Sequence, residues 1–138
     1  MRNTTNKIGT AAHHMELDTK AYADVLVLAP AGRIDHTNCD RFLEAIQPEL
    51  ERCTASGPRI VFDLSRLEYV SSAGLRCFLI AAKQVKPLGG TVVVAAMRPV
   101  VKEIFEISRF NLVFPIFDTL RAAVAQVSPA ALPALDAG

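Results

Sequence analysis

Short stretches that are apolar throughout alternate along this chain with longer stretches whose apolar residues recur at helical spacing. Residues 25–29 (VLVLA), 60–62 (IVF) and 91–96 (TVVVAA) are of the first kind and predict buried strands, because a strand that is apolar on both faces must be covered on both. Residues 15–20 alternate between apolar and polar and predict one more strand, which a turn at 21–24 joins to the next.

The stretches at helical spacing predict four helices. The first covers residues 39–54 with Thr37 or Asn38 as its cap, and Pro48 inside it predicts a kink or break near Ile46–Gln47, since an internal proline costs about 3 kcal/mol. The other three helices begin at Ser71–Ser72, at Arg98–Pro99, and after a cap at Asp118 or Thr119.

A last strand at residues 112–117 contains Pro115, which favours an edge position. The resulting order, β-β-α-β-α-β-α-β-α, predicts an α/β fold with a mixed, mostly parallel sheet of about five strands and about four helices. A chain of 138 residues suits a single domain, placed at residues 15–127. Residues 1–14 read as a flexible N-terminal arm and residues 128–138 as a flexible tail.

Composition removes several classes of function. Lys and Arg number 15 against 14 Asp and Glu, a net charge of +1, and no basic cluster is present, which argues against nucleic acid as the main partner. No apolar run is long enough to insert into a membrane and the N-terminus lacks the apolar segment of a signal peptide, so we expect a cytoplasmic protein.

The three cysteines have no CxxC spacing and are expected to be reduced and structural. The pair His13–His14 alone makes a weak metal site, and we expect no metal or cofactor.

Two adjacent serines at the start of the second helix carry the candidate chemistry. One of them can serve as the helix cap, a role worth about 1 kcal/mol. The other, Ser72, is a candidate phosphoacceptor, because a helix N-terminus stabilises an anion and Arg76 follows one turn later. Gly74 leaves the surface bare beside them.

Several motifs occur together and in a characteristic order. They are Gly32–Asp35 (GRID), residues 62–65 (FDLS), residues 69–76 (YVSSAGLR), residues 104–107 (IFEI) and residues 114–117 (FPIF). With these motifs the chain, over about residues 15–127, resembles a STAS domain of the bacterial anti-sigma factor antagonist family. It departs from the family pattern at Ser71, where well-known members have Asp, and at Arg109–Phe110, where a Gly often ends the third helix.

The resemblance implies a regulatory switch that works by exchange of partners. It implies binding to an anti-sigma factor that is also a serine kinase of the GHKL ATPase type, release of a sigma factor, inactivation by phosphorylation at the position of Ser72, and resetting by a PPM-type phosphatase. The implied partner-binding residues are Gly32, Arg33, Asp35, His36, Thr37, Asn38, Ser71, Ser72, Ala73, Gly74 and Arg76.

Three other functions were weighed. A serine hydrolase needs G-x-S-x-G and a base, but Val70 stands two residues before Ser72 and His36 is the only histidine in the predicted domain, so we expect no catalytic residue and no enzyme. Nucleotide binding lacks a Walker loop or G-x-G-x-x-G. A STAS scaffold subunit of a stress-signalling or lipid-transport assembly, without phosphorylation, remains the alternative.

Overall fold

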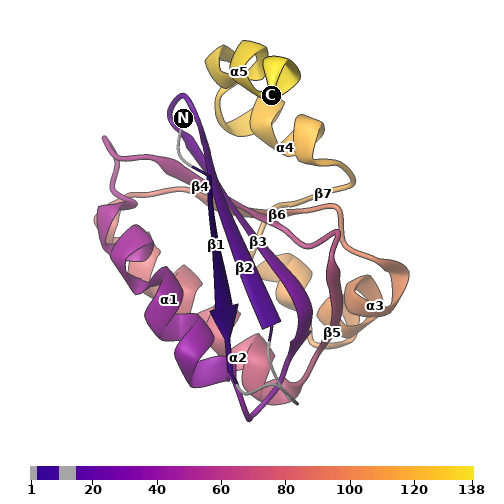
Figure 1. Cartoon of the computed structure of the whole chain (residues 1–138). Coiled ribbons are helices and arrows are strands. Elements are labelled where there is room, and N and C mark those ends of the chain that lie inside the picture. The colour runs from indigo at the N-terminus through magenta and orange to yellow at the C-terminus, as the bar shows by residue number, and fades with distance from the viewer. Residues whose placement is uncertain (1–2, 10–14) are drawn as a thin grey trace.

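The computed structural model describes residues 3–9 and 15–138 (Figure 1). The strands in these residues are β1 (Asn3–Ile8), β2 (Met15–Tyr22), β3 (Val25–Ile34), β4 (Arg59–Asp63), β5 (Leu67–Val70), β6 (Val92–Ala95) and β7 (Ile116–Phe117). The helices are α1 (Cys39–Arg52), α2 (Ser72–Val85), α3 (Pro99–Ile107), α4 (Leu120–Val127) and α5 (Leu132–Ala137). Short 3-10 turns are η1 (Lys86–Leu88), η2 (Phe110–Leu112) and η3 (Pro129–Ala131).

The sheet is mixed and centres on β3. Its order is β1-β2-β3-β4-β6-β7, with β1, β2 and β3 antiparallel and β3, β4, β6 and β7 parallel. The first half of β3 pairs with β4, and its last residues, from Gly32 to Ile34, pair in parallel with β5 instead. The register shifts between Gly32 and Arg33, and Gly32 has a φ of +98°, a conformation that favours glycine.

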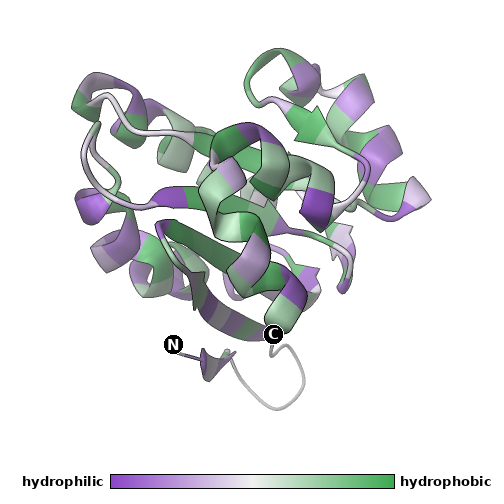
Figure 2. Cartoon of the chain, turned by 90° about the horizontal axis from the view of Figure 1, so that it is seen from above, coloured by the Kyte–Doolittle hydropathy of each residue, from purple (hydrophilic) through white to green (hydrophobic). Residues whose placement is uncertain are grey.

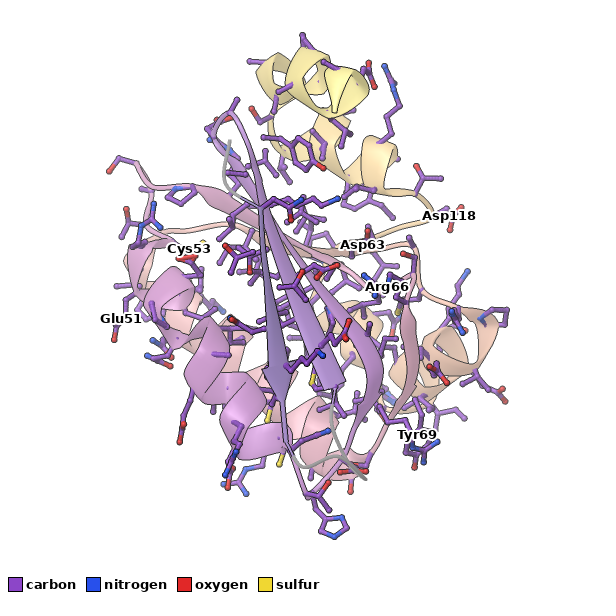
Figure 3. The ribbon with its side chains drawn as sticks, in the orientation of Figure 1. Glu51, Cys53, Asp63, Arg66, Tyr69 and Asp118 are labelled. Atoms are coloured by element: carbon purple, nitrogen blue, oxygen red, sulfur yellow. The ribbon has the colours of Figure 1, made fainter. Side chains whose placement is uncertain are left out.

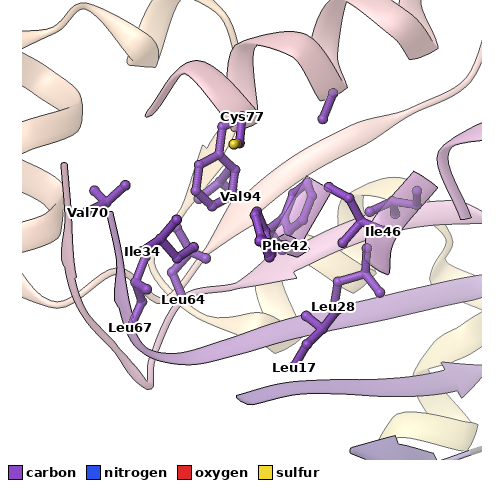
Figure 4. Packing of buried hydrophobic residues seen from close by; sticks show 14 of the residues in the cluster. Leu17, Leu28, Ile34, Phe42, Ile46, Leu64, Leu67, Val70, Cys77 and Val94 are labelled. Atoms are coloured by element: carbon purple, nitrogen blue, oxygen red, sulfur yellow. The ribbon is translucent and has the colours of Figure 1, made fainter. Parts of the chain in front are cut away.

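One face of the sheet carries the larger part of the core. Side chains from β2, β3, β4 and β6 meet α1, α2 and α3 there, and Figure 4 shows part of this packing. Phe78 of α2 lies at its centre, with ring centroids 5.5 Å from Phe42, 5.1 Å from Phe62 and 5.8 Å from Phe105. These tilted and edge-on contacts are the favoured geometries of aromatic pairs, and they fix the three helices on the sheet.

The opposite face is covered by the C-terminal segment. Alternate residues of the same strands, among them Val27, Val61 and Val93, pack against α4, η3 and α5. Arg121 of α4 is paired with Asp136 of α5 at 3.1 Å, and Ser128 donates a hydrogen bond to Asp24 at 2.6 Å. The chain therefore ends beside the turn between β2 and β3 (Figure 1). Hydrophobic and hydrophilic residues alternate along the helices in Figure 2, as expected for elements with one buried side.

The predicted fold class is confirmed, and the strand and helix counts are each too low for the described residues. Residues 3–8 were predicted to be an arm but form β1, paired over its whole length with β2. Residues 128–138 were predicted to be a tail but include η3 and α5, held by the pairs just described. Residues 10–14, with His13 and His14, lie outside the described residues.

Three local predictions about proline or short strands also need correction. Helix α1 runs without a break through Pro48, which is an exposed residue, and the helix ends at Arg52. Strand β3 continues past Pro30, which lies between the last residue paired with β4 and the first paired with β5. The predicted strand at 112–117 is reduced to β7, although it does lie at the edge of the sheet. None of the helices in the described part of the chain combines the length and the apolar character needed to cross a bilayer.

Candidate functional site

Helix α2 begins with a serine cap, and the cap is Ser71. Its backbone is extended (φ −83°, ψ 175°), and its hydroxyl oxygen accepts a hydrogen bond from the backbone N–H of Gly74 at 3.3 Å. Its own N–H donates to the carbonyl oxygen of Ile34 at 2.9 Å. Ser71 therefore caps the helix and ties its start to the end of β3.

Ser72 is the first residue of α2, and its side chain is exposed. The N–H groups of Ser72 and Ala73 belong to the first turn, where a helix offers no acceptor of its own. Together with the helix dipole they favour negative charge at this position. Arg76, one turn further along, is exposed as well. The site thus combines a hydroxyl open to solvent with a local environment that tolerates an anion.

Gly74 allows α2 to approach β3 and β5 closely. A Cβ atom at this position would lie 2.6 Å from Cγ2 of Val70, 2.8 Å from the carbonyl oxygen of Ile34 and 2.9 Å from its Cγ2. These distances are far shorter than ordinary contacts, so a larger residue would push the start of the helix away from the sheet. The sequence explained Gly74 by a bare surface at the helix start, whereas the glycine is buried and its role is this packing.

The turn between β3 and α1 is held by side-chain hydrogen bonds. Asn38 is only 2% exposed; its Nδ2 donates to the carbonyl oxygen of Arg33 at 2.9 Å, and its Oδ1 accepts from the N–H of Asp35 at 3.0 Å. The carboxylate of Asp35 accepts from the N–H of Thr37 at 2.9 Å and from its hydroxyl at 2.5 Å. Asn38 is the N-cap residue by position, but its side chain bonds to the preceding turn rather than to the helix. The turn is therefore a fixed structure.

Arg33 and His36 present side chains to solvent from this same segment. The guanidinium carbon of Arg33 lies 4.5 Å from the ring centroid of Tyr69 on β5, within the range of a cation–π contact. Figure 3 shows Tyr69 on the flank of the molecule, well separated along β4 and β5 from Asp63 and Arg66. Tyr69 stood within the sequence motif without a role, and its contact with Arg33 supplies one.

Two cysteines join the starts of α1 and α2. The thiol of Cys77 donates to the carbonyl oxygen of Cys39, the first residue of α1, at 3.2 Å. Both residues are buried, and burial, with the neighbouring Cys39 second, raises the pKa of the Cys77 thiol to about 12. Both are free thiols, in agreement with the prediction, and so is Cys53 at the other end of α1 (Figure 3). Sequence spacing gave no signal for the contact, because 38 residues separate the pair.

The structure thus brings the two predicted segments, Gly32–Asn38 and Ser71–Arg76, to one end of the molecule. Ile34 and Val70 are paired across β3 and β5, and each is followed within a few residues by the start of a helix. Among the described residues, no group of three or more His, Cys, Asp or Glu is arranged to hold a metal ion. The site offers exposed polar groups on a rigid support.

Comparison with known proteins identifies the family of this fold. The model of the STAS domain family matches residues 16–123. The anti-sigma factor antagonist BtrV of Bordetella bronchiseptica is 37% identical over 112 residues, which cover 80% of this chain and 93% of that protein. The anti-sigma F factor antagonist of Paenibacillus polymyxa is 24% identical over 105 residues, 76% of this chain and 88% of that protein.

Solved structures agree with this assignment at the level of the fold. An anti-sigma factor antagonist from Thermotoga maritima superposes with a TM-score of 0.72 at 22% identity, covering 79% of this chain and 92% of its own. The unphosphorylated form of the anti-sigma factor antagonist SpoIIAA has a TM-score of 0.67 at 17% identity, covering 82% and 96%. The chain belongs to the STAS domain family, among the members named anti-sigma factor antagonists.

Proposed function

We propose that this chain is an anti-sigma factor antagonist that binds a cognate anti-sigma factor through the surface formed by Gly32–Asn38 and Ser71–Arg76. That anti-sigma factor would be a serine kinase of the GHKL type, and phosphorylation of Ser72 would end the binding. A PPM-type phosphatase would restore the binding form. The names of the relatives support the first part of the proposal, and SpoIIAA, which shares the fold, has been solved in a phosphorylated form.

The observation that carries the proposal is the different use of two neighbouring serines. The hydroxyl of Ser71 is engaged as the cap of α2 and is partly buried, whereas Ser72 is exposed. A kinase would have to reach the partly buried hydroxyl of Ser71 and disturb its hydrogen bond with Gly74, whereas modification of Ser72 leaves that bond intact. Ser72 is therefore the better acceptor of the two.

Phosphorylation of Ser72 would act on the surface and not on the fold. The modified residue carries about −1.5 to −2 charges at neutral pH. The start of α2 stabilises such a charge by about 0.3–1 kcal/mol, and Arg76 lies one turn away on the same helix. A partner that packs closely on Ala73 and the backbone above Gly74 would, however, have to bury this charge without compensation. Binding is lost while the domain remains folded.

The proposal predicts which variants accept phosphate. The purified chain, Ser71→Ala and Ser72→Ala are each incubated with Mg-ATP and a lysate of the source organism in which kinase activity of this type has been demonstrated, and intact mass is measured. We expect one added phosphate on the wild type and on Ser71→Ala, and none on Ser72→Ala. A phosphate added to Ser72→Ala would show that a residue other than Ser72 is the phosphoacceptor.

Absence of phosphate from all three proteins would contradict the switch and leave a scaffold role for the domain. A binding assay then separates the two functions. Ser72→Ala should retain an anti-sigma factor kinase in the presence of ATP, while Ser72→Asp should lose it. Retention by Ser72→Asp would show that charge at this position does not control binding.

A further inference from the structure

A groove of about 520 Å³ lies at the opposite end of α2 from Ser72. Its walls are the C-terminal half of α2, the connection from η1 to β6, and the segment that follows η2. The residues that line it are mostly apolar, among them Leu79, Ala82, Val85, Val92, Val113 and Phe114. A concave, mainly apolar hollow of this size falls in the range of small-molecule sites.

The charged residues that line the groove are all positive. Lys83 of α2 and Lys86, the first residue of η1, both line it three residues apart, and no acidic residue is found among the described residues that line it. Neither lysine takes part in an ion pair within the described part of the chain. A second hollow, along α1, is by contrast lined by Asp40, Glu44 and Glu51. The two lysines of this groove are suited to an anionic group, and its apolar walls are suited to an aliphatic body.

Exposed apolar side chains mark the rim of the same groove. Leu112 is 76% exposed and Val113 39% exposed, and both line it. Large apolar side chains that gather around one hollow and remain in water are a common mark of a binding site.

We propose that this groove binds an aliphatic carboxylate of the fatty-acid class, with the chain along Leu79, Ala82 and Val113 and the carboxylate between Lys83 and Lys86. Two ammonium groups one helical turn apart can share one carboxylate. Their methylene stems extend the apolar wall beneath the headgroup. This site lies outside the surface proposed for the anti-sigma factor, so its occupation is independent of that proposal.

Titration of the full chain with dodecanoate, below its micelle concentration, tests the assignment. We expect saturable binding with one ligand per chain in calorimetry, and amide shifts in NMR spectra that concentrate at residues 79–92 and 112–114 and leave Ser71–Arg76 unchanged. Decanoate should bind more weakly, by up to about fourfold for each methylene that the groove buries. Dodecyltrimethylammonium, with the same chain and opposite charge, should not bind.

Charge reversal provides the matched variants. Lys83→Glu combined with Lys86→Glu should weaken dodecanoate binding about tenfold, because two attractive contacts become repulsive. Lys102→Glu, at an exposed position on α3, should leave it unchanged. Ala82→Trp, which fills the groove, should abolish binding while the thermal unfolding temperature shows that the domain remains folded.

Three results would overturn the proposal. The first is equal binding of the cationic amphiphile or of the doubly reversed variant. The second is shifts spread over the whole surface without saturation. The third is a concentration-dependent dimer in analytical ultracentrifugation that Leu112→Asp dissociates, which would assign the groove to a second copy of this chain.

Discussion

The starts of α1 and α2 lie side by side, yet they are built for different tasks. At the start of α1 the polar side chain of Asn38 is buried, and both its amide oxygen and its amide nitrogen are bonded to the backbone of the preceding turn. At the start of α2 the cap Ser71 is bonded but the next residue, Ser72, extends into solvent. The polar groups at the start of α1 are therefore bonded within the protein and support the fold. The start of α2 leaves the hydroxyl of Ser72 open to solvent. The proposed modification of Ser72 without unfolding requires both features.

The thiol of Cys77, which contacts Cys39 at the start of α1, should be protected from alkylation in the folded state. With its pKa raised to about 12, Cys77 holds almost no thiolate at pH 8, whereas an unfolded cysteine with a pKa near 8.5 holds a substantial fraction. Alkylation of Cys77 by iodoacetamide should therefore be slower by on the order of a thousandfold in buffer than in urea, as followed by mass spectrometry.

The raised pKa of Cys77 also makes the free energy of unfolding decrease as the pH rises above about 8.5. A thiol whose folded pKa is raised contributes its stabilisation fully below the unfolded pKa, and that stabilisation is lost as pH rises from about 8.5 toward the folded pKa. Rapid alkylation of Cys77 in the folded protein would contradict the predicted protection, because it would show that the hydrogen bond from Cys77 to Cys39 is broken in solution.

Gly74→Val should push the start of α2 away from β3 and β5. Because even a Cβ atom meets Val70 and Ile34 at less than 3 Å, the valine should reduce the free energy of unfolding by about 3 kcal/mol. Urea denaturation measures the loss. Lys83→Val, which places the same side chain at an exposed position of α2, should cost less than about 1 kcal/mol. Equal losses in the two variants would mean that close packing on β3 and β5 does not explain Gly74, since helix propensity alone favours valine over glycine.

Asn38→Ala should weaken the support of α1. It leaves the partly buried carbonyl of Arg33 and N–H of Asp35 without their side-chain partner, so we expect a loss of about 2 kcal/mol. Thr37→Ala, at an exposed position of the same turn, should cost clearly less. If the order of the two costs is reversed, the turn is held by Asp35 and Thr37 rather than by Asn38.

Ser71→Ala should remove the cap of α2 at a cost of about 1 kcal/mol. Thr119→Ala offers a matched control, because Thr119 caps α4 in the same way, accepting from the N–H of Ala122 at 3.0 Å. Thermal unfolding of both variants should show losses of similar size. An unchanged Ser71→Ala would mean that Ser72 takes over the cap, and the two serines would then be interchangeable.

Ser72→Ala should have the smallest effect, within about 0.5 kcal/mol of the wild type, because the side chain is exposed. Ser72→Asp should be as stable or slightly more stable, since a negative charge is favoured at a helix N-terminus. Chemical denaturation of both variants checks this. A loss above 1 kcal/mol in either would show that Ser72 supports the fold, and the difference between the two starts would disappear.

The elements that could be predicted from the sequence are those with a strong hydrophobic pattern. Strands β3, β4 and β6 contain nearly continuous apolar runs. Residue type narrowed the caps to Ser71 or Ser72 for α2 and to Asp118 or Thr119 for α4, and the structure shows that Ser71 and Thr119 are the caps. The positions of the candidate site residues also followed, because parallel strands place the helix starts at one edge of the sheet.

The missed elements are those whose stability comes from tertiary contacts. Strand β1 has the sequence NTTNKI and little apolar character; its pairing with β2, together with the bond from Thr5 to Asp18, holds it in place. Strand β5 has only four residues and pairs with the far part of β3 after the shift at Gly32. Helix α5 contains a proline and becomes ordered by packing on α4 and by Arg121. Arg109 has a φ of 60°, a left-handed conformation that glycine adopts more readily than other residues.

The described ends of the chain have a practical consequence for experiments on surfaces. Asn3 is paired with Lys20, and the C-terminal segment is bonded to Asp24, so both ends lie near the turn that joins β2 to β3. The segments Gly32–Asn38 and Ser71–Arg76 lie at the far end of β3, whose 10 residues span about 33 Å. A sensor chip, a bead or a fluorescent fusion attached at the C-terminus would therefore hold the molecule with Ser72 facing the solution. Under the proposed function, immobilised protein should accept the kinase and the anti-sigma factor at the same rate as protein in solution.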